Sequence, residues 1–291
     1  MRLHWIVRAL IVAASLLAVA SSGAVERKPQ FKANRIEVRY AEPESPDQQA
    51  VFKLLMERRA LEKLRDLIAP IKLPITLTLQ TQSCQGQVNA WYDGKSVIVC
   101  YELVDEIWKH VPDKTTPAGI APVDAMVGPF VHVFLHETGH ALFDLLSLPV
   151  LGREEDAADQ FATYFMLQFE RDEARRLIGG AAYQYKEDIL FPTVTKPLKQ
   201  FSDEHGTAEQ RFYNLLCMAY GSDQKLFGDL VTSGYLPKER AELCPVEYAK
   251  VANAFAALLG PYLDLKLAAK QPKRWLATVD TRPPRWRAPS P

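Results

Sequence analysis

A long apolar segment of this chain contains a pair of histidines. His136 and His140 lie four residues apart in VHVFLHETGHALFD, where apolar side chains recur at a spacing typical of a helix. Residues four apart lie on one face of a helix, so both imidazoles are expected to point toward a common centre. Imidazoles placed in this way are typical zinc ligands. The sequence therefore predicts a metal-binding helix.

Glu137 directly follows the first histidine and completes an HExxH pattern. Its side chain is expected on the adjacent side of the same turn, close enough to reach a water at the metal without being a ligand. A carboxylate in that place can accept a proton from water, which predicts that Glu137 is the general base of a hydrolysis. The alternative is a pair of half-buried histidines beside a solvent-facing glutamate. His132, one turn earlier, could also pair with His136, but that pair lacks an intervening glutamate.

A catalytic zinc ion usually has three protein ligands and one position open to water. After a loop with Pro149 and Gly152, a second helical pattern begins at REEDAADQFA. An antiparallel helix pair would bring the first turn of this helix back to the two histidines. Its acidic residues, from Glu154 to Asp156, are also what a helix N-terminus favours for electrostatic reasons alone. The spacing alone does not decide whether this acidic cluster supplies a metal ligand or only stabilises the helix N-terminus.

Together, the two helices resemble those of the gluzincin metallopeptidases, in which a glutamate on a second helix completes the zinc site and an aspartate one turn later braces the histidines. Glu155, Ala158 and Asp159 match this ExxAD pattern. The resemblance implies Zn²⁺ held by His136, His140 and Glu155, with Asp159 orienting an imidazole through its free N–H. The connection between the helices is shorter than in many gluzincins, so it requires a tight turn.

An upstream segment, QVNAWY, resembles the edge strand that lines the cleft of many such peptidases. The resemblance implies that Asn89, Ala90 and Tyr92 lie in a substrate cleft, where an extended peptide could add to the strand. Trp91 and Tyr92 should alternate sides, with one entering the core and the other facing the site. Packing alone would explain either aromatic residue equally well.

A downstream segment, DEHGTAEQR, resembles an HGTxxQR segment of bacterial zinc peptidases. The resemblance implies His205 as a second catalytic residue, which would stabilise the oxyanion of the tetrahedral intermediate. Tyr92 and Tyr213 are weaker candidates for that role. The alternative is that Asp203 or His205 only caps the following helix. The whole layout, from about Val38 to Ser222, closely resembles a bacterial family of proposed metallopeptidases of unknown function.

The wider pattern predicts the α+β class, with a zincin-like domain in which a small mixed sheet precedes an HExxH helix and a mostly helical C-terminal half. The 35 basic and 35 acidic residues balance, which argues against a nucleic-acid partner. Strands are predicted within 31–40, 75–82, 87–93 and 96–103, and helices within 46–68, 102–110, 123–146, 153–170, 204–220 and 245–265.

The first 24 residues have two arginines before an apolar run and end in small residues, which is typical of a signal peptide. We therefore expect a secreted or periplasmic protein, with a membrane contact only if this segment is not cleaved. Residues 25–265 are predicted to form one metallopeptidase domain and residues 266–291 a Pro-rich tail. The four cysteines suit an oxidising compartment, and the pairs Cys84–Cys100 and Cys217–Cys244 are the favoured disulfides.

These predictions combine into zinc-dependent hydrolysis of a peptide bond by a metal-activated water, with Glu137 as the base and a polypeptide as the substrate. We expect an endopeptidase rather than an exopeptidase. Two alternatives remain at this point: a catalytically silent zinc-binding or polypeptide-binding protein, and a zinc amidase acting on a cell-wall bond. The oligomeric state is not predicted.

Overall fold

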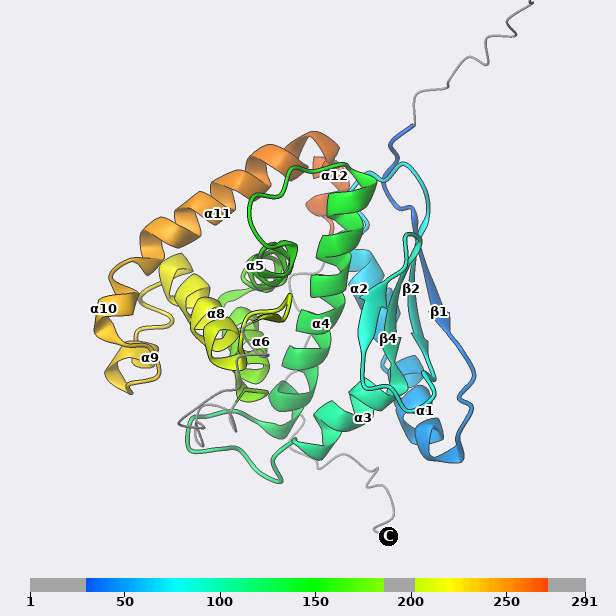
Figure 1. The fold of residues 1–291 in the computed structure, drawn as a ribbon, viewed down its shortest axis with the longest axis horizontal. Helices are drawn as coiled ribbons and strands as arrows, with labels where there is room; N and C mark the ends of the chain where they lie inside the picture. Colours follow the sequence, from blue (N-terminus) through cyan, green and yellow to red (C-terminus); the bar gives the residue numbers. More distant parts are fainter. Residues whose placement is uncertain (1–29, 186–201, 272–291) are drawn as a thin grey trace, which may run out of the picture.

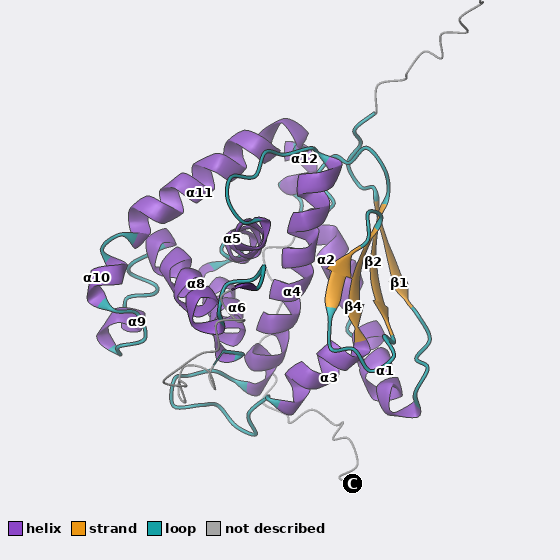
Figure 2. Cartoon of the chain, viewed as in Figure 1, coloured by secondary structure: helices purple, strands orange, loops and turns teal. Residues whose placement is uncertain are grey.

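The computed structural model describes residues 30–185 and 202–271. The signal peptide predicted for residues 1–24 and most of the predicted tail lie outside these residues. Within them, four strands form one sheet, and helices joined by loops are concentrated in the C-terminal half (Figures 1 and 2). The predicted α+β class is confirmed.

The sheet is mixed and small, with the strand order β1-β2-β4-β3. Strands β1 (Ile36–Tyr40), β2 (Leu77–Gln82) and β4 (Ser96–Cys100) are parallel, and β3 (Ala90–Tyr92) pairs antiparallel with β4. Most of β4 is buried, which explains its continuous apolar sequence SVIVC. The β3 strand forms one edge of the sheet.

A tight turn joins β3 to β4, as the Asp93-Gly94 pair predicts. Gly94 has a φ of 93°, a conformation that favours glycine. The Asp93 carboxylate accepts hydrogen bonds from the backbone N–H groups of Lys95 (3.0 Å) and Ser96 (2.7 Å). These bonds fix the turn and therefore the register of the edge strand.

The single helix predicted for residues 46–68 is wrong. The structure has a short 3-10 turn followed by two helices, α1 (Gln49–Glu57) and α2 (Ala60–Ile68). The break falls at Arg59, whose φ of 51° is left-handed. No glycine or proline marks this position, so the local sequence carries no signal for the break.

Helix α4 is the centre of the molecule and holds both histidines of the HExxH motif. It packs against β3 and β4 on one side and against α5 and α6 on the other (Figure 1). The helices of this half are α3 (Tyr101–Lys109), α4 (Pro122–Leu145), α5 (Glu154–Met166), α6 (Arg171–Tyr183), α8 (Ala208–Ser222), α9 (Asp229–Thr232), α10 (Lys238–Ala241), α11 (Cys244–Leu259) and α12 (Leu265–Ala268).

Helix α6 is absent from the sequence-based prediction, and its glycines explain the omission. Consecutive glycines lower helix propensity and suggest a break. In the structure they allow α6 to cross α4 closely: a Cβ added at Gly180 would lie 1.8 Å from the carbonyl oxygen of Asp124. On α4, a Cβ at Gly128 would lie 2.4 Å from the backbone nitrogen of Ala181. The glycines are needed for the helix crossing.

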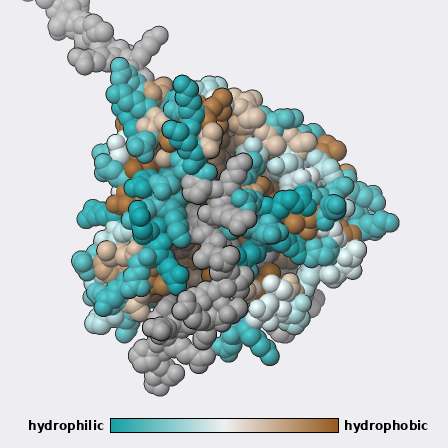
Figure 3. Space-filling model, turned by 180° about the vertical axis from the view of Figure 1, so that it is seen from behind, coloured by the Kyte–Doolittle hydropathy of each residue, from teal (hydrophilic) through white to brown (hydrophobic). Residues whose placement is uncertain are grey.

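Both favoured disulfides are confirmed. Cys84–Cys100 joins the segment after β2 to the end of β4, and Cys217–Cys244 joins α8 to the start of α11. In the described part of the chain, no helix combines the length and apolar character that a membrane span needs. On the face opposite to that of Figure 1, hydrophilic and hydrophobic residues are interspersed over the described surface (Figure 3).

Candidate metal centre

Helices α4 and α5 approach closely at the HExxH motif, because the second variable position of the motif is a glycine. A Cβ at Gly139 would lie 3.3 Å from the Cα of Ala158, which is tight contact. His136 and His140 both project from α4, and their Nε2 atoms lie 3.2 Å apart. The two rings are nearly perpendicular, with centroids 4.9 Å apart. Both Nε2 atoms therefore face one point.

Glu155, in the first turn of α5, faces the same point. Its Oε2 lies 3.0 Å from Nε2 of His136, and its Oε1 lies 3.4 Å from Nε2 of His140. One ligand atom from each of the three side chains lies within 4.8 Å of the other two. The acidic residue that the family resemblance implies as a ligand is thus beside the histidines.

Two carboxylates hold the opposite nitrogens of these rings. Asp159 Oδ1 lies 2.8 Å from Nδ1 of His136, and Glu154 Oε1 lies 2.8 Å from Nδ1 of His140. A neutral imidazole that donates Nδ1–H to a carboxylate has its lone pair at Nε2. Two lone pairs and a carboxylate then face one another with no donor between them. This donor set fits a divalent cation such as zinc.

The charges around the histidines are strongly coupled. Burial lowers the pKa of His136, but the hydrogen bonds to Asp159 and Glu155 outweigh it and raise this pKa to about 9. Burial also opposes ionisation of Glu155, yet the hydrogen bonds from the three histidines around it hold its pKa far below the usual range. The local field therefore strongly favours positive charge at the centre of the cluster.

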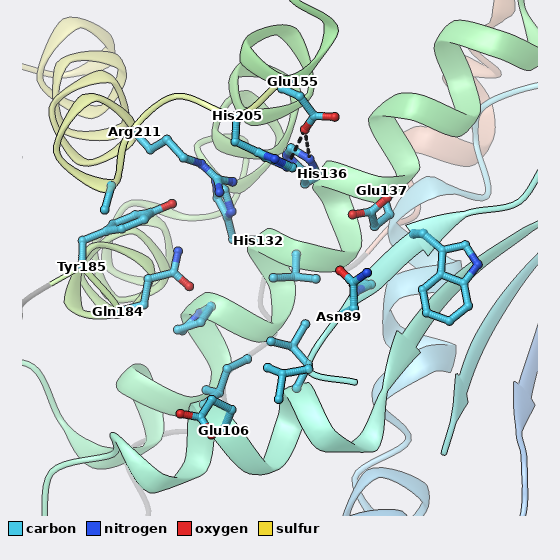
Figure 4. Close-up of a pocket in the computed structure, with 18 of the residues that line it drawn as sticks. Asn89, Glu106, His132, His136, Glu137, Glu155, Gln184, Tyr185, His205 and Arg211 are labelled. Carbon is cyan, nitrogen blue, oxygen red and sulfur yellow. Dashed lines mark hydrogen bonds and ion pairs between the residues drawn. The ribbon is translucent and has the colours of Figure 1, made fainter. Parts of the chain in front are cut away.

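Glu137 lines the same cleft but is not part of the three-residue cluster. Figure 4 shows its carboxylate beside His136, on the side that faces Asn89. Burial raises the pKa of Glu137, and the neighbouring histidines oppose this effect. A carboxyl group whose pKa is raised is a stronger base than an ordinary glutamate, which suits a group that accepts and returns a proton.

His205 lies in the segment before α8, and its Nε2 lies 2.7 Å from Oε2 of Glu155 (Figure 4). Its ring is roughly parallel to that of His136, with centroids 5.9 Å apart. Asp203 accepts a hydrogen bond from the backbone N–H of His205 at 3.0 Å. The helix cap is instead Thr207, which forms a capping box with Gln210. Capping by Asp203 or His205 is therefore wrong, and His205 instead lines the cleft.

A cleft of about 850 Å³ surrounds the cluster, and the edge strand forms one of its walls. Asn89, Ala90 and Tyr92 all line it, as does Trp91. Both aromatic residues are only partly buried, and Tyr92 also packs against the hydrophobic core. The Tyr92 hydroxyl donates to Asp144 at 2.9 Å, which ties β3 to the end of α4.

The other candidate residues are not part of the three-residue cluster. Tyr213 packs against Phe212 and is not among the residues that line the cleft. His132 is buried and also borders the cleft, but it is not part of the three-residue cluster.

Sequence reasoning gave no role to Arg211 and treated Glu154 only as a neighbour of the expected ligand. Arg211 donates to both carboxylate oxygens of Asp159 at 2.7 Å, and Glu154 binds His140. Arg211 lies within the HGTAEQR segment, and its position in that motif is the sequence signal that could have identified it. For Glu154 the signal was its place directly before Glu155.

A family model described as "Putative metallopeptidase" (DUF4344) matches residues 40–259, which is most of the chain. The chain belongs to this metallopeptidase family. Membership suggests peptide hydrolysis in general, a bound metal and a polypeptide substrate. The comparisons with curated proteins and with solved structures found no match.

Proposed function

We propose that this family member hydrolyses peptide bonds with a zinc ion held by His136, His140 and Glu155. One observation carries the proposal: two imidazole Nε2 atoms and a carboxylate face one point, while both Nδ1 atoms are bound to carboxylates. Three nitrogen and oxygen ligands with a fourth position toward a cleft are typical of catalytic zinc. Asp159 orients His136 in this scheme.

Zinc in this place supplies a Lewis acid that polarises a peptide carbonyl and lowers the pKa of water. Glu137 accepts the proton of the attacking water and then delivers it to the leaving amine. His205 is close enough to the ligand cluster to donate a hydrogen bond to the developing oxyanion. No covalent bond to the protein forms.

The cleft supports an extended polypeptide as substrate and an internal bond as the target. The edge strand β3 lines it, so a peptide can pair with the free side of that strand. The lining extends from Glu155 to Glu106, which lie at opposite ends of the cleft (Figure 4). A cleft that continues beyond the proposed metal site can hold several residues of a chain, which favours an endopeptidase. The two disulfides support an oxidising compartment, the periplasm or the exterior.

The test compares the wild type with Glu137→Gln, which keeps the size of the side chain and removes the base. Metal content is measured by mass spectrometry of the purified protein, and hydrolysis is measured with casein. We expect about one zinc per chain in both proteins and loss of activity of at least about 100-fold in the variant. The exposed Glu239→Gln serves as a matched control and should keep full activity. Hydrolysis that survives in Glu137→Gln contradicts the assigned base, and zinc binding without hydrolysis in the wild type favours a silent zinc-binding protein.

A further inference from the structure

The cleft extends from the proposed zinc ligands toward α3, which carries Glu106 (Figure 4), and several of its lining residues are apolar. On α4, Ala125, Pro129 and Val133 line it at intervals of four residues, and Glu137 is next in the same row. Residues four apart are neighbours on a helix surface. This apolar row therefore begins directly beside the proposed catalytic base.

Two other segments also line the cleft with apolar side chains. Leu103 and Ile107 line the cleft from α3, again four residues apart, and Val88 lines it from the segment before β3. Val88 is 51% exposed although it lies in a concave part of the surface. An apolar side chain left open to solvent in a cleft gains from contact with an apolar ligand group.

Charged groups bound this apolar stretch at its far end. Figure 4 shows Glu106 at the opposite end of the cleft from Glu155. The Glu106 carboxylate lies 3.0 Å from the ammonium of Lys109 and 3.8 Å from Nδ1 of His110. Because the ammonium of Lys109 already pairs with this carboxylate, the walls favour an apolar group over a basic one.

We propose that these six residues form an apolar subsite, which takes the large aliphatic or aromatic side chain of the substrate residue next to the cleaved bond. The subsite consists of Val88, Leu103, Ile107, Ala125, Pro129 and Val133. The inference rests on the proposed function and adds a substrate class to it. Burial of a leucine or phenylalanine side chain is worth about 1.5–3 kcal/mol, which is enough to select among substrates by about 10- to 100-fold.

The test uses Val88→Asp, because this exposed side chain contributes little to the core and its replacement should not prevent folding. The matched control is Ile75→Asp, at an apolar residue that is 41% exposed and does not line the cleft. Casein is digested with each zinc-loaded protein, and the cleaved bonds are mapped by mass spectrometry. We expect Leu, Ile, Met or Phe to be enriched at one position beside the bond cleaved by the wild type and by Ile75→Asp.

In Val88→Asp this enrichment should fall about tenfold, and Lys or Arg should become more frequent at the same position. Enrichment of charged or small residues by the wild type overturns the proposal. An unchanged cleavage profile in Val88→Asp does so as well.

A binding measurement separates this inference from the proposed function. Zinc-loaded Glu137→Gln is titrated with uncleaved hexapeptides that differ at one position, Leu against Asp or Lys, by isothermal calorimetry. We expect the Leu peptide to bind about tenfold more tightly, and Val88→Asp in the same background to remove that difference. Equal affinities for the three peptides contradict the subsite. If the wild type binds the Leu peptide selectively but hydrolyses no peptide, the subsite is supported and the proposed catalysis is contradicted.

Discussion

Arg211 donates two hydrogen bonds to the carboxylate of Asp159, from Nε to Oδ2 and from Nη2 to Oδ1, each at 2.7 Å. The same Oδ1 lies 2.8 Å from Nδ1 of His136. Burial raises the pKa of Asp159, but the hydrogen bonds with His136 and Arg211 outweigh it and hold this pKa far below the usual range. Arg211 therefore keeps Asp159 ionised and fixes its orientation toward the ring.

This relationship predicts that Arg211→Lys weakens zinc binding without touching a ligand. Lysine keeps the charge but cannot bind both carboxylate oxygens in a planar fork. Loss of a partner that orients a metal ligand typically costs about 10- to 100-fold in metal affinity, and we expect the lower end of that range. The measurement is zinc competition with a chromophoric chelator at pH 7.5. Arg171→Lys, in the exposed pair with Asp223, is the control and should leave zinc affinity unchanged. Equal affinity in Arg211→Lys and the wild type would exclude this orienting role.

The two carboxylates that bind the histidine Nδ1 atoms are predicted to differ in importance. Asp159 has a side chain only 15% exposed, whereas that of Glu154 is 53% exposed. Water competes for an exposed hydrogen bond and weakens its net contribution. We therefore expect Asp159→Asn to reduce zinc affinity several-fold more than Glu154→Gln, in the same chelator competition. A larger loss in Glu154→Gln would contradict the assigned order.

The sequence was informative where the chemistry depends on short-range spacing. The four-residue interval of His136 and His140 placed both rings on one helix face, and the ExxAD resemblance selected Glu155 from three adjacent acidic residues. The structure brings these side chains together. Their roles in binding and catalysis stay predictions. The turn at Gly94 and both disulfides could also be predicted, because each depends on a local signal.

Features that depend on tertiary contacts could not be predicted. Arg211 and Asp159 lie 52 residues apart, so nothing local relates them. The break at Arg59 lacks any turn residue. The glycines of α6 have two possible interpretations, a helix break or a close helix crossing. Only the position of α4 decides between them.

Gly180→Ala tests the close crossing of α4 and α6. The added methyl group would lie 1.8 Å from the carbonyl oxygen of Asp124, a backbone atom that cannot move without shifting α4. Overpacking of this kind costs about 1–3 kcal/mol or more, which exceeds the gain of about 1 kcal/mol in helix propensity. We expect a lower free energy of unfolding in urea. Gly260→Ala is the matched control, because a Cβ there meets nothing within 4 Å and its φ is −49°. Gly180→Ala at or above wild-type stability would show that the crossing is not tight.

His132 predicts a specific pH dependence of stability. His132 is 2% exposed, and burial lowers the pKa of its imidazole to about 4. The negative charge of Asp159 opposes this shift, while the positive charges of Arg211 and His136 reinforce it. The ordinary value of about 6.5 applies to the unfolded chain, so folding requires a neutral ring.

Above pH 6.5 the ring is neutral in both states, and its contribution to stability is fully present. As the pH falls from 6.5 to about 4, the unfolded chain binds a proton that the folded protein does not, and this contribution is lost. A difference of about 2.5 pH units corresponds to roughly 3 kcal/mol, as an upper estimate. We therefore expect the wild type to lose more free energy of unfolding between pH 7 and pH 4.5 than His132→Gln, which has no titrating group at this position. Urea denaturation of both proteins with EDTA present measures the difference, since other titrating groups contribute equally to both. Parallel pH profiles would mean that the folded protein accommodates a charged His132.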